Sequence, residues 1–319
     1  RFKDDYGREN KPYEGQNQMF SLEKNDVVFK DPSVNSLNKY KINKIDVCLE
    51  KYKEKTHLLE KNQNTIFAIL DGGLVSENDQ LVLSPGDIVR YDTIKNTWGK
   101  DFENIYYFGG DQSNPDEIIK LDYPDQYSSI LYIQHDIYEY LYNAHPDADW
   151  YCVINDDAVL FKDNLMHILN QYDASNDLYL GTAKRENLCL GNYDLTGGKY
   201  SGVYYASGGP GFFISNPLMK KMVPKNKEML SLWINDCPRR FRLMTQFIDA
   251  GLAYQLYEFF NVSVTDINTE DYRLYTQLPK HYIENKGEQI CKNPMGYHYV
   301  TPEIMVDFYN KYISGKAIK

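Results

Sequence analysis

The stretch from Trp150 to Phe161 reads WYCVINDDAVLF, and it decides the fold. Its first part, Trp150–Ile154, is continuously apolar, which is typical of a β-strand covered on both faces. The strand runs directly into Asn155, Asp156 and Asp157. Open α/β sheets bind ligands at the carboxyl ends of their strands, so these polar side chains stand where a ligand would bind.

Alternation of side chains along this strand separates the three polar residues. Asn155 and Asp157 start on one face of the strand and Asp156 starts on the other. Hard divalent cations such as Mg²⁺ and Mn²⁺ take oxygen ligands, commonly one or two carboxylates together with phosphate oxygens. The cluster is therefore a candidate metal site, and a simple turn or helix cap after the strand is an equally weighted alternative.

The surrounding segments predict an α/β domain with a mostly parallel central sheet flanked by helices. Apolar runs and turn signals alternate with helical periodicity on both sides of the acidic cluster. The expected strands are Thr65–Leu70, Asn104–Phe108, Trp150–Ile154 and Asp177–Leu180; the expected helices run from a cap at Asp87 to Trp98 and over Ser128–Ala144, Leu218–Met222 and Leu243–Phe260.

The first 63 residues are polar and irregular, unlike the rest of the chain. We expect residues 1–63 to form an N-terminal stem or extension packed on the core, with a helix over Ile45–Leu59. Residues 64–319 then form the main domain. The chain opens without Met, and no run approaches the roughly 18 apolar residues that span a bilayer, so we expect a luminal piece with any membrane anchor outside it.

The charge balance restricts the class of ligand. With 35 Lys and Arg against 45 Asp and Glu, the formal net charge is −10, which argues against a general nucleic-acid binder. An anionic nucleotide would need a local basic patch or a divalent cation. The 29 tyrosines suit a sugar-binding groove, although biased composition explains their number equally simply.

Cysteine usage leaves the redox compartment open. No CxxC pair is present, so a structural zinc site is disfavoured. Cys152 lies in the apolar strand and is expected to be a free buried thiol. The other four either form two disulfides, which would indicate a secretory compartment, or stay reduced; they are Cys48, Cys189, Cys237 and Cys291. One glycosylation sequon begins at Asn261.

Two further segments carry candidate ligand contacts. Tyr205–Ser215 reads YASGGPGFFIS, in which glycines permit positive φ and close approach of the backbone to a ligand; a plain turn is the alternative. Arg90–Lys100 reads RYDTIKNTWGK, in which Arg90 is a candidate partner for a nucleotide phosphate or base. A solvated basic face with Trp98 in the core is the other interpretation of this segment.

In their order and spacing, these three segments resemble the Fringe-like β-1,3-glycosyltransferases of the family 31 group, including core-1 galactosyltransferase relatives. The resemblance covers roughly residues 64–305. It implies a GT-A fold with a Rossmann-like nucleotide-sugar domain. It also implies inverting transfer of a sugar from a UDP-sugar to a hydroxyl of a glycan or glycoprotein, with β-1,3 linkage and with Mn²⁺ or Mg²⁺ as cofactor.

The resemblance assigns roles around the metal. Asp157 matches the family's metal ligand, and Asn155 and Asp156 match the positions that face metal or uridine, with Asn155 replacing an acid of the family's DDD block. His298, in MGYHYVTP, would complete the metal site, although composition alone favours a hydrogen-bonded core histidine. The glycines that match the loop at the junction of donor sugar and acceptor are Gly208, Gly209 and Gly211.

The resemblance also requires a general base at the start of a helix. Asp249 in FIDAGLAY takes that position and is expected to be partly buried. Ile248 and Ala253 stand where the family has an acid and a glycine. Asp236 is the second candidate for the base.

Two rival functions remain at this stage. One is a retaining GT-A enzyme or a nucleotide-sugar hydrolase; the other is a non-catalytic sugar- or nucleotide-binding protein, which the departures at Asn155 and Ala253 favour. We expect a location in the Golgi or endoplasmic reticulum lumen or outside the cell, with the cytoplasm still open.

Overall fold

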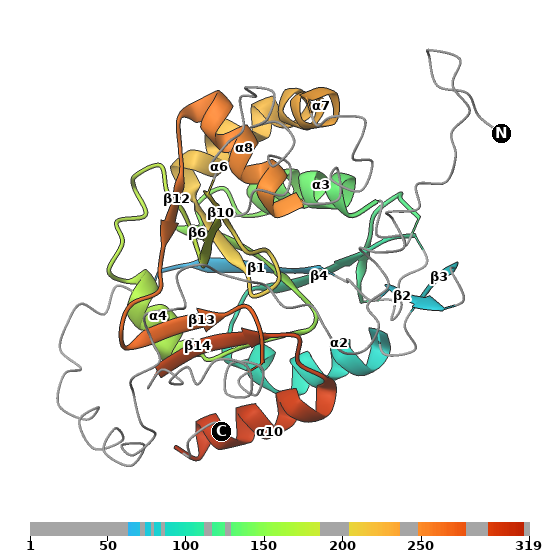
Figure 1. The fold of residues 1–319 in the computed structure, drawn as a ribbon, viewed down its shortest axis with the longest axis vertical. Helices are drawn as coiled ribbons and strands as arrows, with labels where there is room; N and C mark the ends of the chain where they lie inside the picture. Colours follow the sequence, from blue (N-terminus) through green and yellow to red (C-terminus); the bar gives the residue numbers. More distant parts are fainter. Residues whose placement is uncertain are drawn as a thin grey trace. The chain divides into compact units, whose positions relative to one another are not determined.

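A seven-stranded sheet carries the fold of this chain, shown as a computed structural model in Figure 1. Every neighbouring pair of strands is parallel except the two pairs made by β11. The predicted α/β class with a mostly parallel sheet is therefore confirmed. In spatial order the strands are β12 (Val264–Asp266), β8 (Tyr179–Gly181), β11 (Phe212–Ser215), β6 (Trp150–Asn155), β1 (Thr65–Leu70), β4 (Ile105–Gly109) and β5 (Ile119–Lys120).

The structure describes only part of the chain, and all of that part lies in the unit from Ile42 to Lys319. The described residues are 63–70, 74–77, 80–83, 87–111, 117–124, 129–185, 204–236, 248–278 and 293–315. Residues 1–62, which hold nearly all of the predicted stem and its helix over Ile45–Leu59, lie outside them. So do Cys48, Cys189, Cys237 and Cys291, whereas Cys152 is a free, buried cysteine as predicted.

Strand register brings two predicted segments together. β1 and β6 run in parallel from Thr65 beside Trp150 to Leu70 beside Asn155, so both strands end at the same edge. β11 runs the other way, with Phe212 beside Val153. Because of this reversal, the chain enters β11 at the edge where β6 ends, which puts the glycine loop next to the acidic cluster.

Two apolar clusters cover the two faces of the sheet. Ile66 and Ala68 of β1 belong to the cluster with α3, α6, α7 and α8, whereas Phe67 and Ile69 belong to the cluster with α2, α4 and α10. Continuous apolar sequence in β1 is explained by this coverage on both faces. The helices are α2 (Asp87–Asn96), α3 (Ile130–Ala144), α4 (Lys162–Leu169), α6 (Asn216–Met222), α7 (Asn226–Asp236), α8 (Ile248–Phe260) and α10 (Pro302–Ile313).

A second, three-stranded sheet lies with α2, α4 and α10 in the second apolar cluster (Figure 1). Its central strand is β14 (Asn293–His298), which pairs with β13 (Tyr272–Tyr275) and with β7 (Ala158–Leu160). Since β7 begins directly after Asp157, this pairing carries the end of β14 to the acidic cluster. The sequence did not predict this sheet. Short pieces complete the described chain: β2 (Leu74–Glu77), β3 (Gln80–Leu83), η3 (Trp98–Asp101), β9 (Ala183–Arg185), β10 (Tyr204–Ala206) and η5 (Val223–Lys225).

Predicted element boundaries hold to within a few residues, as is usual for helix and strand ends. The strand over Thr65–Leu70 is confirmed as predicted. Asp87 is the first residue of α2 rather than its cap, and the helix ends at Asn96 rather than at Trp98, which starts a 3-10 turn and is fully buried. The strand expected from Asp177 starts at Tyr179. Residues 243–247 of the last predicted helix lie outside the described part.

Candidate active site

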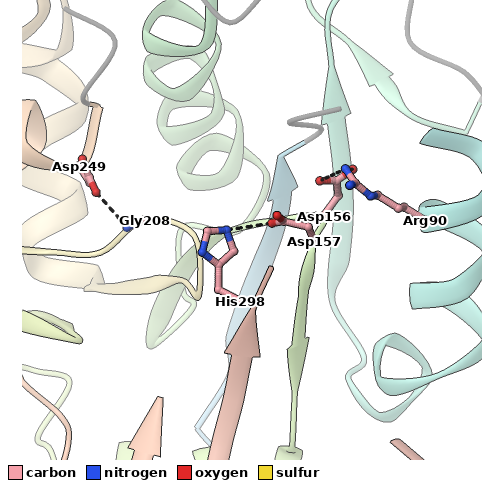
Figure 2. Close-up of polar contacts among 6 residues, drawn as sticks. All are labelled: Arg90, Asp156, Asp157, Gly208, Asp249 and His298. Atoms are coloured by element: carbon pink, nitrogen blue, oxygen red, sulfur yellow. Dashed lines mark hydrogen bonds and ion pairs between the residues drawn. The ribbon is translucent and has the colours of Figure 1, made fainter. Parts of the chain in front are cut away.

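Asp157 and His298 face each other at the edge where β6 and β14 end (Figure 2). Their atoms Oδ1 and Nε2 are 2.9 Å apart, and both side chains are mostly buried. The contact is not a hydrogen bond, and neither atom has a hydrogen-bond partner among the described residues. Buried polar atoms are nearly always satisfied, so this pair is incomplete as it stands.

Three backbone features hold this pair in place. β14 and β7 set His298 opposite Ala158, the residue after Asp157. Val300 donates its backbone N–H to the carbonyl oxygen of Asp157 at 2.9 Å. Gly209 leaves room for the imidazole, because a Cβ at this glycine would lie 2.0 Å from Cε1 of His298. No residue with a side chain could occupy position 209 without displacing that ring.

The chemistry of the two incomplete atoms fits a divalent cation. A carboxylate oxygen and an imidazole nitrogen are both common ligands of Mn²⁺, and Mg²⁺ and Mn²⁺ accept few protein ligands when phosphate oxygens fill other positions. Within the described residues, no group of three or more His, Cys, Asp or Glu side chains could hold a metal ion. Asp157 and His298 are thus a two-ligand candidate.

Asp156 points to the opposite side, toward Arg90 of α2 (Figure 2). Both of its carboxylate oxygens lie 3.4 Å from Nη1 of Arg90. The alternation of Asp156 and Asp157 therefore follows the prediction for a strand end. Asn155 is half-buried, and its backbone N–H donates to the carbonyl of Gly209 at 3.3 Å, which ties the end of β6 to the glycine loop.

Asp249 lies in the first turn of α8, at the start of a helix as the resemblance requires. Its Oδ2 accepts the backbone N–H of Gly208 at 3.2 Å, and its Oδ1 accepts that of Ala250 at 2.9 Å. The residue is half-buried, as expected for a candidate base. Asp236, the second candidate, is the last residue of α7.

The glycine loop joins these parts. Gly208 contacts Asp249 while the next residue, Gly209, lies against His298, so the loop lies between the two ends of the site (Figure 2). Of the three predicted loop glycines, only Gly211 has positive φ, at 97°. A Cβ there would lie 3.3 Å from Sγ of Cys152, so Gly211 also brings the loop down onto β6.

A buried polar cluster that sequence reasoning missed fixes α8 to its neighbours. His135 of α3 lies with Nδ1 2.5 Å from Oδ1 of Asn226, the first residue of α7, and with Nε2 3.3 Å from Nε2 of Gln255 on α8. Burial lowers the pKa of His135 to about 4, so the ring is neutral at neutral pH. Since these residues are 91 and 120 positions apart, no local pattern could have linked them.

A family model for Fringe-like proteins matches residues 88–237. Residues 88–237 are therefore similar to Fringe-like proteins. That range includes Arg90, the acidic cluster and the glycine loop, whereas Asp249 and His298 follow it. The match confirms the Fringe-like resemblance found in the sequence.

Curated relatives of the Fringe-like domain match part of the chain. Human chondroitin sulfate synthase 3 is 30% identical over 130 residues, which cover 37% of this chain and 14% of the human protein. Mouse beta-1,3-glucosyltransferase is 25% identical over 150 residues, which cover 47% of this chain and 28% of the mouse protein. The chain thus spans less than a third of either relative's length.

Solved glycosyltransferases are similar over more of the chain at lower identity. A glycosyltransferase involved in glycosylation of the major capsid of PBCV-1 is 14% identical, covers 77% of this chain and 98% of its own, and has a TM-score of 0.42. A galactosyltransferase in complex with donor and acceptor sugar analogues is 13% identical and has the same TM-score, with 81% and 97% covered. No helix among the described residues is long and apolar enough to cross a membrane.

Proposed function

We propose that this chain is an inverting, metal-dependent glycosyltransferase of the secretory pathway, acting in the Golgi or endoplasmic reticulum lumen. Its donor is a UDP-sugar, its acceptor is a hydroxyl of a glycan or glycoprotein, and the linkage formed is β-1,3. The observation that carries the proposal is the pair of incomplete buried atoms, Oδ1 of Asp157 and Nε2 of His298. The Fringe-like match and the names of the relatives support the reaction class.

Asp157 and His298 would hold Mn²⁺ or Mg²⁺ with the diphosphate of the donor on its open side. The cation would offset the negative charge that develops on the departing UDP. The two side chains are held by the strand pairing of β14 with β7 and by Gly209, so they need not rearrange when the donor binds. Such preorganisation is a large part of electrostatic catalysis.

Asp249 would act as the general base. The acceptor hydroxyl oxygen bonds to the anomeric carbon while the bond from that carbon to the diphosphate oxygen breaks, and the hydroxyl proton passes to the carboxylate of Asp249. One direct displacement inverts the anomeric centre. The backbone N–H groups of Gly208 and Ala250 hold the carboxylate in a fixed orientation before the reaction.

Arg90, Asp156 and Asn155 would form the nucleotide end of the site. The guanidinium of Arg90 already offsets the charge of the buried Asp156 carboxylate, and it would contact a uridine or phosphate group of the bound donor. With an overall charge of −10, the chain needs such local positive charge to accept a nucleotide diphosphate.

The test is calorimetry of UDP binding with and without Mn²⁺. The unaltered chain should bind UDP with Mn²⁺ and lose that binding when EDTA is added. Mutation of a residue that only supports a metal ligand lowers metal affinity by about 10- to 100-fold. Loss of a ligand itself should have a larger effect, so Asp157→Asn and His298→Ala should each lower Mn²⁺-dependent UDP affinity by at least about 100-fold.

Matched controls are Asp147→Asn and His167→Ala, because both side chains are exposed and lie outside the site. Each should bind UDP as the unaltered chain does. If UDP binding by the unaltered chain does not depend on a metal, the metal-dependent function is wrong. If transfer occurs but NMR finds a product with the donor's anomeric configuration, the inverting mechanism is wrong.

A further inference from the structure

Tyr299, the residue directly after His298, has an unusual backbone conformation. Its φ is 61°, in the left-handed region that bulky side chains rarely adopt. Among the described residues, the other non-glycine residue with positive φ is Asn261, a residue type that tolerates this region. A strained aromatic residue beside a candidate metal ligand requires a physical reason.

Asp157 holds the chain on both sides of Tyr299. The residue before it, His298, faces the Asp157 carboxylate at 2.9 Å, and the residue after it, Val300, donates its N–H to the Asp157 carbonyl at 2.9 Å. Thr301 then caps α10 through its side-chain oxygen. With its neighbours fixed in this way, the chain must turn sharply at Tyr299, and the same contacts that build the metal pair maintain the strain.

The strained turn places the tyrosine ring on the imidazole. The ring centroids of Tyr299 and His298 are 3.8 Å apart and the ring planes differ by 30°. Tyr299 is nevertheless 58% exposed, so a large part of its surface faces solvent. A residue that served only to pack against His298 would be expected to bury more of its ring, because burial of apolar area is what stabilises such contacts.

From this geometry we infer that Tyr299 is a stacking subsite for a pyranose ring, an inference that rests on the proposed function. The C–H face of a pyranose packs on an aromatic ring, and the tyrosine hydroxyl can bond its hydroxyl groups. In Figure 2, His298 lies between Gly208 and Asp157, with Asp156 and Arg90 on the far side of Asp157. Because Tyr299 stacks on His298, it lies beside the metal pair, next to which a sugar on the diphosphate would lie.

Donor and acceptor could both supply this pyranose, and the experiment separates them. Tyr299→Asn removes the ring but keeps a residue that tolerates positive φ, so the variant should melt at or above the Tm of the unaltered chain. Tyr299→Phe keeps the ring. Tyr257→Asn is the matched control, because Tyr257 is 50% exposed near the end of α8 and is not part of the site.

Affinities are measured by calorimetry in MnCl₂ for UDP, UDP-glucose, UDP-galactose and their two N-acetyl analogues. KM is measured for a panel of p-nitrophenyl glycosides. For Tyr299→Asn we expect UDP affinity to stay within about twofold, and either UDP-sugar affinity or acceptor KM to worsen about tenfold, as for loss of one aromatic contact. Tyr257→Asn should keep both values. Tyr299→Phe keeps the ring and loses only the hydroxyl, so its loss should be smaller than that of Tyr299→Asn.

A loss confined to UDP-sugars identifies the donor pyranose, and a loss confined to acceptor KM identifies the acceptor pyranose. Equal weakening of UDP and UDP-sugars overturns the inference, because Tyr299 would then contact the nucleotide or only support His298. Unchanged values for every ligand overturn it as well. If the unaltered chain shows no Mn²⁺-dependent UDP binding, it is the proposed function that fails.

Discussion

The two ends of the site are built differently. At one end, Asp157 and His298 approach to 2.9 Å, and their facing atoms have no hydrogen-bond partner in the part of the chain that the structure describes. At the other end, both oxygens of Asp249 accept backbone N–H groups. The first end is electrostatically incomplete without a ligand, whereas the second is completed by the chain itself.

Under the proposed function, this difference separates the end that would bind the cation from the end that would take the proton. Buried groups that lack partners are costly, and a cation that fits between them would recover that cost on binding. A half-buried carboxylate with oriented N–H donors is instead ready to take a proton from a bound hydroxyl without a ligand of its own. Breaking each end separately should therefore produce separate defects.

The largest effect is expected at the self-contained end. Asp249→Asn keeps the shape and the contact with Gly208 but removes the proton acceptor, so kcat should fall about 10²- to 10⁴-fold. Mn²⁺-dependent UDP affinity should stay unchanged, as calorimetry would show. Asp236→Asn is the control and should retain near-normal turnover. Near-normal turnover in Asp249→Asn would rule it out as the base.

Acid should destabilise the folded chain by protonating His135, which packs against α8, the helix that carries Asp249. The pKa of His135 is about 4 in the folded chain against a usual 6.5, so the unfolded chain binds a proton more readily between these values. Stability is therefore fully present above pH 6.5 and is lost as pH falls toward 4, by about 3 kcal/mol in total. Urea unfolding of the unaltered chain and of His135→Gln across this range measures it, and equal pH slopes in both would contradict the assignment.

Alanine substitutions at the adjacent glycines Gly208 and Gly209 should have different effects on UDP binding. Gly209→Ala puts a methyl group 2.0 Å from the His298 ring, which must move, and the overpacking should weaken Mn²⁺-dependent UDP binding about 100-fold. The Cβ added in Gly208→Ala meets only Asp249, with Cβ of that residue the nearest atom at 3.5 Å, which is an ordinary contact. The loss of UDP affinity in this variant should therefore stay near threefold. Calorimetry of both variants checks this, and equal losses would show that the loop, rather than His298, is the sensitive element.

The smallest effect is expected at Arg90. Arg90→Ala leaves the negative charge of Asp156 next to the proposed diphosphate position, so UDP affinity should fall about tenfold. Arg90→Lys keeps the positive charge but loses the planar guanidinium with its several N–H donors. Its UDP affinity should therefore lie between that of the unaltered chain and that of Arg90→Ala. An unchanged affinity in Arg90→Ala would place the nucleotide elsewhere.

The central sheet could be predicted from the sequence because its signals are local. Strand β1 was predicted to the residue, since an apolar run covered on both faces is read directly from Thr65–Leu70. The opposite faces of Asp156 and Asp157 followed from alternation alone. Helix ends such as that of α2 were less certain, because one turn of 3-10 structure at Trp98 has little local signature.

The site itself depends on contacts that no local pattern encodes. The proximity of Asp157 to His298 was expected from the family resemblance and not from spacing, and it arises from the pairing of β14 with β7, two short strands far apart in sequence. The need for glycine at 209 comes from a ring contributed by residue 298. The left-handed turn at Tyr299 likewise results from tertiary bonds to Asp157, which override the backbone preference of tyrosine.

The reversed direction of β11 affects how this domain can diversify. The chain enters the strand at the reactive edge of the sheet and leaves it at the opposite edge, beside the start of β6. A change of length between β10 and β11 would therefore reshape the substrate side, whereas a change between β11 and α6 would emerge at the back. Length changes before β11 would thus alter the substrate side, whereas length changes after β11 would leave that side unchanged.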